Sequence, residues 1–182
     1  MLSLKELEKS ESLRTIVFTL NVPTREEVLL STEKELDCTK HSLNACYSGL
    51  GLNDKSSSWY DVQLIVEGDS EDLPSKTEWF YIVTDDGYLF KARFEGKKSK
   101  KLNSFENTLL IGKWIKGRLA ELGFVENFKE VSEDPKKHGI ITQEMLGGYG
   151  GNQIFLKKTQ KTKKDGKGLE RDVWFMSFPF KL

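Results

Sequence analysis

The sequence lacks the features that mark membrane, secreted and zinc-binding proteins. No apolar run approaches the roughly 18 residues of a membrane span, and the amino terminus has no apolar signal core. Only two cysteines are present, Cys38 and Cys46, which are too few for a disulfide framework or a zinc site of the usual spacing. We therefore expect a cytoplasmic protein with two free thiols and no contact with a membrane.

Catalytic motifs are equally scarce. Neither of the two histidines, His41 and His138, begins a His-x-Lys pair, and no nucleophile elbow, Walker loop or metal-ligand cluster is present. The glycine-rich residues 147–151 follow a helix-like turn and precede a strand, which is the reverse of the order in a nucleotide-binding loop. The sequence thus predicts no catalytic residue, no cofactor and no metal, and it predicts a tight helix-to-strand connection at these glycines.

Charge is balanced in total but not along the chain. The 182 residues are 31% charged and 37% hydrophobic, with a net charge of zero, which suits one soluble domain with a real core. Residues 1–80 carry 8 Lys and Arg against 15 Asp and Glu, whereas residues 81–182 carry 20 against 13. This asymmetry indicates a basic face on an otherwise acidic body.

The central stretch predicts a hairpin, a basic loop and a helix. Residues 79–84 are aromatic and β-branched, and an Asp-Gly turn at residues 85–87 leads into a second strand at residues 88–94. Residues 96–104 are lysine-rich and too polar for a core, and apolar residues then repeat at helical spacing over residues 110–122. Within that helix, Trp114 and Ile115 are expected in the core, while Lys113, Lys116 and Arg118 suggest a basic face.

Arg93 and Asn103 flank the lysine-rich loop and suggest contact with nucleic acid. Arginine pairs with guanine edges and asparagine with adenine edges, while lysines attract phosphates. For the lysines alone, a loop kept soluble by its charges is the simpler interpretation. A second candidate is the loop of residues 49–59, whose Gly, Ser, Asn and Lys residues fit either a plain surface loop or one that follows a groove.

Further strands are expected at residues 15–20, 61–66, 153–158 and 173–178. The last two enclose a second basic loop, which would add nonspecific attraction for phosphate. In total, about seven strands and two helical segments are indicated. The predicted fold is mainly β with α: a seven-stranded antiparallel or mixed pseudobarrel whose ends are closed by two short helices.

Several separated motifs resemble the carboxy-terminal domain of phospholipase-D-type restriction endonucleases, the NgoFVII, NgoAVII and BfiI group. The similarity covers roughly residues 47–156. Its motifs, in order, are Ser48-Gly49-Leu50 with Leu52-Asn53, Phe80 with Thr84-Asp85-Asp86-Gly87, Lys100-Lys101 with Asn103-Ser104, Leu110 with Gly112-Lys113-Trp114-Ile115-Lys116 and Leu119, and Ile141-Thr142 with Glu144, Leu146 and Tyr149-Gly150.

The resemblance implies a DNA-binding pseudobarrel like that of the plant B-three transcription factors, in which two arms grip the major groove. The amino-side arm would be residues 49–59 and the carboxy-side arm residues 93–104. Residues 47–182 would form this domain, and residues 1–46 an interdomain connection and packing segment. The His-x-Lys nuclease domain of the family would lie on a separate piece, so the chain would be inert alone, and a dimeric parent is compatible with the resemblance.

Double-stranded DNA is the expected partner, and the two arms supply the candidate contacts. The base-reading candidates are Asn53, Asp54, Lys55, Arg93 and Asn103. The phosphate-binding candidates are Ser56, Ser57, Ser58, Lys91, Lys97, Lys98, Lys100, Lys101 and Ser104.

Two other functions fit the residues. Asp85, Asp86 and Glu95 could hold magnesium as a nuclease does, since carboxylates on two strands are the usual ligands of such a site. Alternatively, the basic loops could bind acidic protein partners. Magnesium-dependent cleavage of DNA would favour the nuclease, and weak salt dependence without preference for duplex would favour the protein-interaction module.

Overall fold

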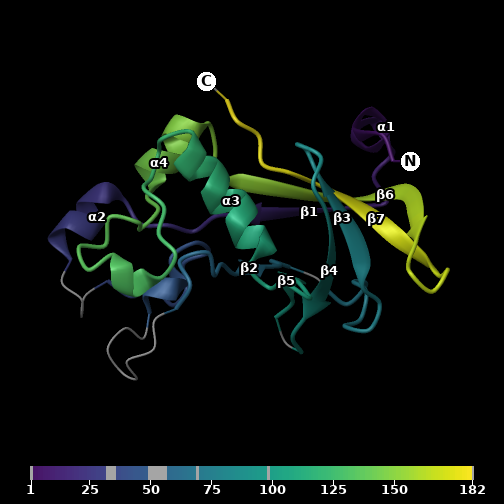
Figure 1. Cartoon of the computed structure of the whole chain (residues 1–182), viewed down its shortest axis with the longest axis horizontal. Coiled ribbons are helices and arrows are strands. Elements are labelled where there is room, and N and C mark those ends of the chain that lie inside the picture. The colour runs from purple at the N-terminus through teal and green to yellow at the C-terminus, as the bar shows by residue number, and fades with distance from the viewer. Residues whose placement is uncertain (1, 32–35, 49–56, 69, 98, 182) are drawn as a thin grey trace. The chain divides into compact units, whose positions relative to one another are not determined.

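A computed structural model describes residues 2–31, 36–48, 57–68, 70–97 and 99–181 (Figure 1). The chain forms two compact units that alternate along the sequence. The sheet unit comprises Met1–Thr19, Leu64–Asn107 and Gln153–Phe178; the helical unit comprises Leu20–Gln63, Thr108–Asn152 and Pro179–Leu182. No helix within the described ranges combines the length and apolar character needed to cross a membrane.

The sheet unit is a single mixed β-sheet. Its strands are β1 (Arg14–Thr19), β2 (Leu64–Ile65), β3 (Phe80–Thr84), β4 (Leu89–Glu95), β5 (Lys101–Ser104), β6 (Gln153–Lys164) and β7 (Glu170–Ser177). They are ordered β1-β6-β7-β3-β4-β5-β2 and form a nearly closed barrel. Neighbours are antiparallel except for the parallel pair β3 and β7. The predicted seven-stranded, mainly β fold is confirmed.

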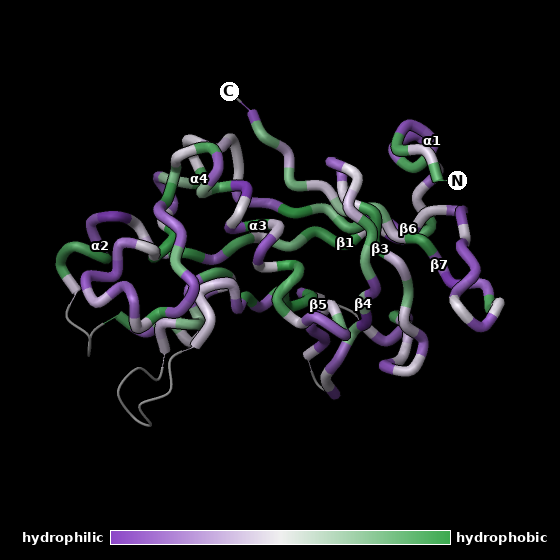
Figure 2. The backbone as a smooth tube through the Cα atoms, in the orientation of Figure 1, coloured by the Kyte–Doolittle hydropathy of each residue, from purple (hydrophilic) through white to green (hydrophobic). Residues whose placement is uncertain are grey.

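One face of the sheet is held by aromatic packing between strands. Phe80 of β3, Phe94 of β4 and Trp174 of β7 are almost fully buried, with ring centroids 5.2–5.8 Å apart. Alternation along the strands places these three on the same side, because successive side chains of a strand point to opposite faces. In Figure 2, much of β3 is coloured hydrophobic, as this burial requires.

The short helix α1 (Leu4–Lys9) covers the opposite face of β3 and β7. Leu7 is fully buried against Tyr81, Val83, Val173 and Phe175. The segment predicted as an interdomain connection and packing segment therefore contributes α1 and β1 to the sheet unit. Its role as a connection stays a prediction.

The helical unit contains more helices than the two that were predicted. In the described residues it holds α2 (Arg25–Leu30), the 3-10 helices η1 (Ala45–Tyr47) and η2 (Val131–Glu133), α3 (Leu110–Glu121) and α4 (Gln143–Tyr149). The Thr142 hydroxyl accepts from Met145 N–H at the start of α4, and Gly150 ends this helix at φ +119°. The left-handed glycine confirms the predicted helix-to-strand connection.

Buried polar groups organise the helical unit. Asn44 pairs with the backbone of Ile141 through its amide, donating at 2.9 Å and accepting at 2.8 Å. The indole of Trp59 is fully buried and donates to the Gly139 carbonyl at 3.0 Å. Trp59 is therefore a packing residue. Trp114 and Ile115 are also buried, which confirms their predicted place in the core.

The predicted basic face of α3 is wrong for Lys116. This side chain is fully buried: its Nζ donates to the Trp59 carbonyl and lies 4.7 Å from the centre of the Trp59 ring. Burial lowers its pKa, because desolvation disfavours the charged form. Lysine counts alone could not reveal this, since they carry no information on which helix face is covered.

Candidate nucleic-acid interface

The loop between β4 and β5 begins with a sharp turn at Gly96. Gly96 has φ +112°, and a Cβ there would lie 2.0 Å from the Ser99 carbonyl oxygen, so the turn requires glycine. Residues 101–104, predicted as loop, form β5, in which Leu102 and Ser104 are buried. With only two buried positions, β5 is too short for its alternation of apolar and polar residues to be recognised in the sequence.

Arg93 and Asn103 lie directly opposite each other on β4 and β5. Glu95 joins them: its Oε1 accepts from Arg93 Nε at 2.6 Å and its Oε2 from Asn103 Nδ2 at 3.1 Å. Arg93, Glu95 and Asn103 are here called the reader cluster, after the base-reading role that the sequence predicts for Arg93 and Asn103. The sequence singled out Arg93 and Asn103 as candidates, but it gave no sign that a single carboxylate accepts hydrogen bonds from both.

Glu95 is charged at neutral pH. Partial burial acts to raise its pKa, but the hydrogen bond and charge of Arg93, followed by the hydrogen bond from Asn103, outweigh burial. The net pKa lies below the ordinary value. A charged Glu95 holds its two donors more firmly than a neutral acceptor would, because hydrogen bonds to ionised groups are the stronger kind.

The reader cluster keeps unused hydrogen-bonding groups. Arg93 engages Glu95 through Nε, and its two terminal nitrogens donate to no other residue that the structure describes. Within the same described ranges, Asn103 Oδ1 accepts no hydrogen bond, and one Nδ2 proton remains after the bond to Glu95. These are the groups that a guanine fork and a bidentate adenine contact require.

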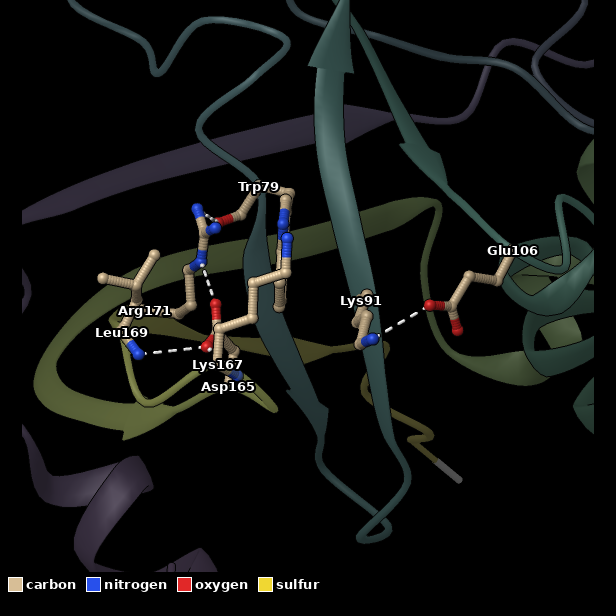
Figure 3. A network of polar contacts seen from close by, with 7 residues as sticks. All are labelled: Trp79, Lys91, Glu106, Asp165, Lys167, Leu169 and Arg171. Carbon is tan, nitrogen blue, oxygen red and sulfur yellow. Dashed lines mark hydrogen bonds and ion pairs between the residues drawn. The ribbon is translucent and has the colours of Figure 1, made fainter.

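A cation–aromatic row extends from the reader cluster across the sheet. It consists of Arg93, Phe105, Trp79, Lys91 and Arg171. Arg93 lies 5.2 Å from the Phe105 ring, which meets the Trp79 ring edge-on at 5.4 Å. Lys91 and Arg171 both contact the Trp79 ring, at 5.1 and 4.2 Å (Figure 3). Sequence reasoning missed this row because its members come together only through strand pairing.

The predicted phosphate ligands of the carboxy-side arm differ in exposure. Lys97 and Lys101 are exposed, and Lys100 is half-buried. Lys91 forms an ion pair with Glu106 at 2.9 Å. Lys98 lies outside the described residues.

Ser104 does not fit its predicted role as a phosphate ligand. It is 1% exposed, and its hydroxyl donates to the Asn107 carbonyl at 2.9 Å. A buried hydroxyl that is already hydrogen-bonded is not presented to a phosphate on the surface.

The amino-side arm is described only where it ends. Its predicted base readers Asn53, Asp54 and Lys55, together with Ser56, lie outside the described residues and stay predictions. Ser57 and Ser58 are half-buried. The Ser57 carbonyl accepts from Val131 N–H at 2.9 Å and Ser58 forms a β-bridge with Glu130, so this end of the arm is anchored by its backbone.

The three carboxylates proposed for a magnesium site do not come together. Asp85 Oδ2 accepts from Phe178 N–H at 3.0 Å, and Asp86 Oδ1 accepts from the Thr84 hydroxyl at 2.6 Å. Glu95 ends β4, about 20 Å from the β3–β4 turn at about 3.3 Å per strand residue. Across the described ranges, no group of three or more His, Cys, Asp or Glu side chains could hold a metal ion.

Comparison with known proteins and families places this chain in a family. A comparison with curated proteins finds no match. The model of the NgoFVII C-terminal B3-like DNA-binding domain matches residues 18–149, which include both predicted arms and the reader cluster. These residues make up most of the chain, so the protein belongs to the family of NgoFVII C-terminal B3-like DNA-binding domains.

Proposed function

We propose that this chain recognises a short sequence of double-stranded DNA as the target-recognition domain of a type II restriction endonuclease and performs no catalysis alone. The observation that carries the proposal is the reader cluster. Arg93 and Asn103 stand opposite each other on paired strands, both oriented by Glu95, and both keep the groups needed to bind base edges. Family membership supports DNA as the ligand.

The chemistry of the reader cluster favours the major groove. Guanine presents two acceptors there, which match the two terminal nitrogens of Arg93, and adenine presents a donor beside an acceptor, which match the amide of Asn103. Orientation by Glu95 reduces the entropy that both side chains lose on binding, because their rotamers are already restricted.

Lysines around the β4–β5 turn would fix the register of the domain on the duplex. Lys97, Lys100 and Lys101 border the reader cluster, and contacts to phosphate position a protein without selecting sequence. Residues 53–58 of the amino-side arm would supply the second set of contacts. Because the parent's nuclease domain and its dimerisation are expected only from the family resemblance, they form part of this proposal.

Selection from a random duplex pool, followed at two salt concentrations, tests the proposal. We expect one short motif to be enriched and to remain enriched at the higher salt, because base contacts depend less on counterion release than phosphate contacts do. Binding that disappears with salt and enriches no motif would remove the recognition function. Magnesium-dependent cleavage by the purified chain would instead support a nuclease.

Arg93→Ala and Asn103→Ala are each expected to relax base preference at one position of the selected motif. The cost for the selected duplex is about 1–3 kcal/mol per variant, the usual value of one bidentate base contact. Lys97→Ala is the matched control: it should weaken binding to all duplexes alike and reduce the salt slope by about 1. Binding constants for single-base variants of the motif measure both effects. Unchanged preference in Arg93→Ala would exclude Arg93 as a reader.

A further inference from the structure

The β6–β7 hairpin lies outside the residues that match the family, yet it emerges beside the reader cluster. β7 runs parallel to β3, with Tyr81 opposite Val173, and β3 runs antiparallel to β4. The start of β7 and the end of β4 therefore lie at the same end of the sheet. The hairpin turn precedes β7 and the turn at Gly96 follows β4, so both turns project from that end.

The outer part of the hairpin, residues 159–172, lies beyond the strand pairing with β1 and β3. The pairing of β6 with β1 ends at Lys158, and that of β7 with β3 begins at Val173. Beyond these points β6 continues through Lys164, about 20 Å at about 3.3 Å per residue. The register of β6 against β7 shifts between Lys158 and Thr162, as it does at a β-bulge. A β-bulge bends the strand that contains it. Figure 1 shows the hairpin projecting at the edge of the sheet unit.

The carboxylates of the hairpin are satisfied within it. Asp165 accepts from the N–H groups of Lys167 and Leu169 and from Arg171 Nε at 3.0 Å (Figure 3). Thr162 Oγ1 donates to Glu170 at 2.6 Å, and Asp172 pairs with Lys158 at 3.5 Å. The acidic groups are thus already engaged.

Three lysines remain on the outside of the hairpin. Lys161, Lys164 and Lys167 are exposed, and none forms an ion pair with a carboxylate in the described part of the chain. Lys163, the cross-strand partner of Arg171, lies 5.4 Å from the centre of the Tyr81 ring, and Arg171 is paired with Asp165. A surface whose exposed lysines are not neutralised by carboxylates suits a polyanion.

The hairpin is firmly held and contiguous with the reader cluster. Arg171 donates to Asp165 and to the Trp79 carbonyl, and it covers the Trp79 ring at 4.2 Å. Trp79 in turn contacts Phe105, over which Arg93 lies. The cation–aromatic row therefore connects the base of the hairpin to the reader cluster through direct contacts.

We propose that residues 159–172 form a phosphate-binding element that contacts duplex DNA flanking the sequence read at β4 and β5. This inference rests on the proposed function and adds a third contact to the two arms. Lys161, Lys164 and Lys167 hold phosphates, while Arg171 and Trp79 keep the hairpin in place. The segment at residues 67–78 is acidic, so contact comes from the hairpin lysines rather than from the whole end of the sheet.

The test compares a selected duplex containing only the motif with one extended by about one helical turn on each side. The variant is Lys161→Gln, Lys164→Gln, Lys167→Gln. The control, Lys129→Gln, Lys136→Gln, Lys181→Gln, removes the same charge from exposed lysines of the helical unit.

Wild type and control should bind the extended duplex about 3- to 30-fold more tightly than the short one, and the hairpin variant should lose this gain. For the hairpin variant on the extended duplex, the slope of log affinity against log salt concentration should be smaller in magnitude by about 2 to 3. Each lost phosphate contact accounts for about 0.9 of this change. Base preference and affinity for the short duplex should not change.

A hairpin variant that keeps the gain from extension would overturn the inference, as would a wild type that gains nothing. Binding to polyglutamate, a probe for acidic protein partners, is measured in parallel. If the variant keeps the gain from extension but loses binding to polyglutamate, the hairpin binds an acidic protein partner instead. Failure of the proposed function is a separate result, in which wild type selects no motif. In that case the salt dependence of binding to a random duplex tests the hairpin by itself. If the hairpin variant shows the same salt slope as wild type, the hairpin does not bind phosphates.

Discussion

Replacing Glu95 with alanine is expected to reduce the ratio of specific to nonspecific DNA affinity by about 30- to 1,000-fold. The carboxylate orients both Arg93 and Asn103, at 2.6 and 3.1 Å. Each bidentate base contact contributes about 1–3 kcal/mol of discrimination, so two readers contribute about 2–6 kcal/mol. Loss of their orientation, with both side chains still present, should remove about 2–4 kcal/mol of this total. The effect should exceed that of either reader substitution alone, because one change releases both side chains.

The same variant should bind nonspecific duplex slightly more tightly. Glu95 is charged and lies beside side chains proposed to touch DNA, so its carboxylate repels the phosphates. Loss of orientation should lower the specific affinity and raise the nonspecific affinity. General unfolding would lower both, so the two explanations can be separated. Titration of the selected duplex and of a scrambled duplex at one salt concentration measures the two affinities.

Glu106→Ala is the matched control for this experiment. Glu106 is also a carboxylate beside the cation–aromatic row, but it pairs with Lys91 and makes no described contact with a reader. Its removal should raise nonspecific affinity without altering base preference. If Glu95→Ala retained the full preference of the wild type, Arg93 and Asn103 would not read bases through the orientation seen here.

Local features of this fold follow directly from the sequence. Apolar residues at helical spacing predicted a helix over residues 110–122, and α3 spans Leu110–Glu121. The Asp-Gly turn is present with Gly87 at φ +94°, where its N–H donates to the Thr84 carbonyl. Such features depend on dihedral preferences and hydrogen bonds within a few residues, so the chain encodes them in one place.

Features that depend on long-range pairing could not be predicted. Arg171 and Trp79 are 92 positions apart and meet only because β7 pairs in parallel with β3. The two hydrogen bonds that Glu95 accepts were missed for a related reason. As one of two acidic residues in a basic stretch, it resembled a stray charge or a metal ligand until the register placed Asn103 opposite Arg93.

Gly112→Ala should give the largest change in stability. Gly112 is buried on α3, and a Cβ there would lie 1.6 Å from the Tyr60 carbonyl oxygen and 2.7 Å from its carbon. No rotamer relieves this clash, because Cβ is fixed to the backbone and its neighbours are backbone atoms. We expect the free energy of unfolding to fall by about 2–4 kcal/mol, at or above the usual range for overpacking.

Gly117→Ala on the same helix is the matched control. Apart from its own stretch of helix, no described atom lies within 4 Å of a Cβ built at Gly117, so this change should stabilise the protein by about 0.5–1 kcal/mol, the ordinary advantage of alanine in a helix. Denaturant unfolding of both variants measures the difference. Equal effects at the two positions would show that α3 does not approach the Tyr60 backbone so closely.

Close approach of α3 to Tyr60 also links stability to function. Lys116 lies one turn after Gly112 and donates to the carbonyl of Trp59, so the same face of α3 fixes two successive residues at the end of the amino-side arm. If that arm binds DNA, Gly112→Ala should weaken binding even at temperatures where the variant is fully folded. Gly117→Ala should leave affinity unchanged, because it stabilises α3 without moving the backbone that α3 supports.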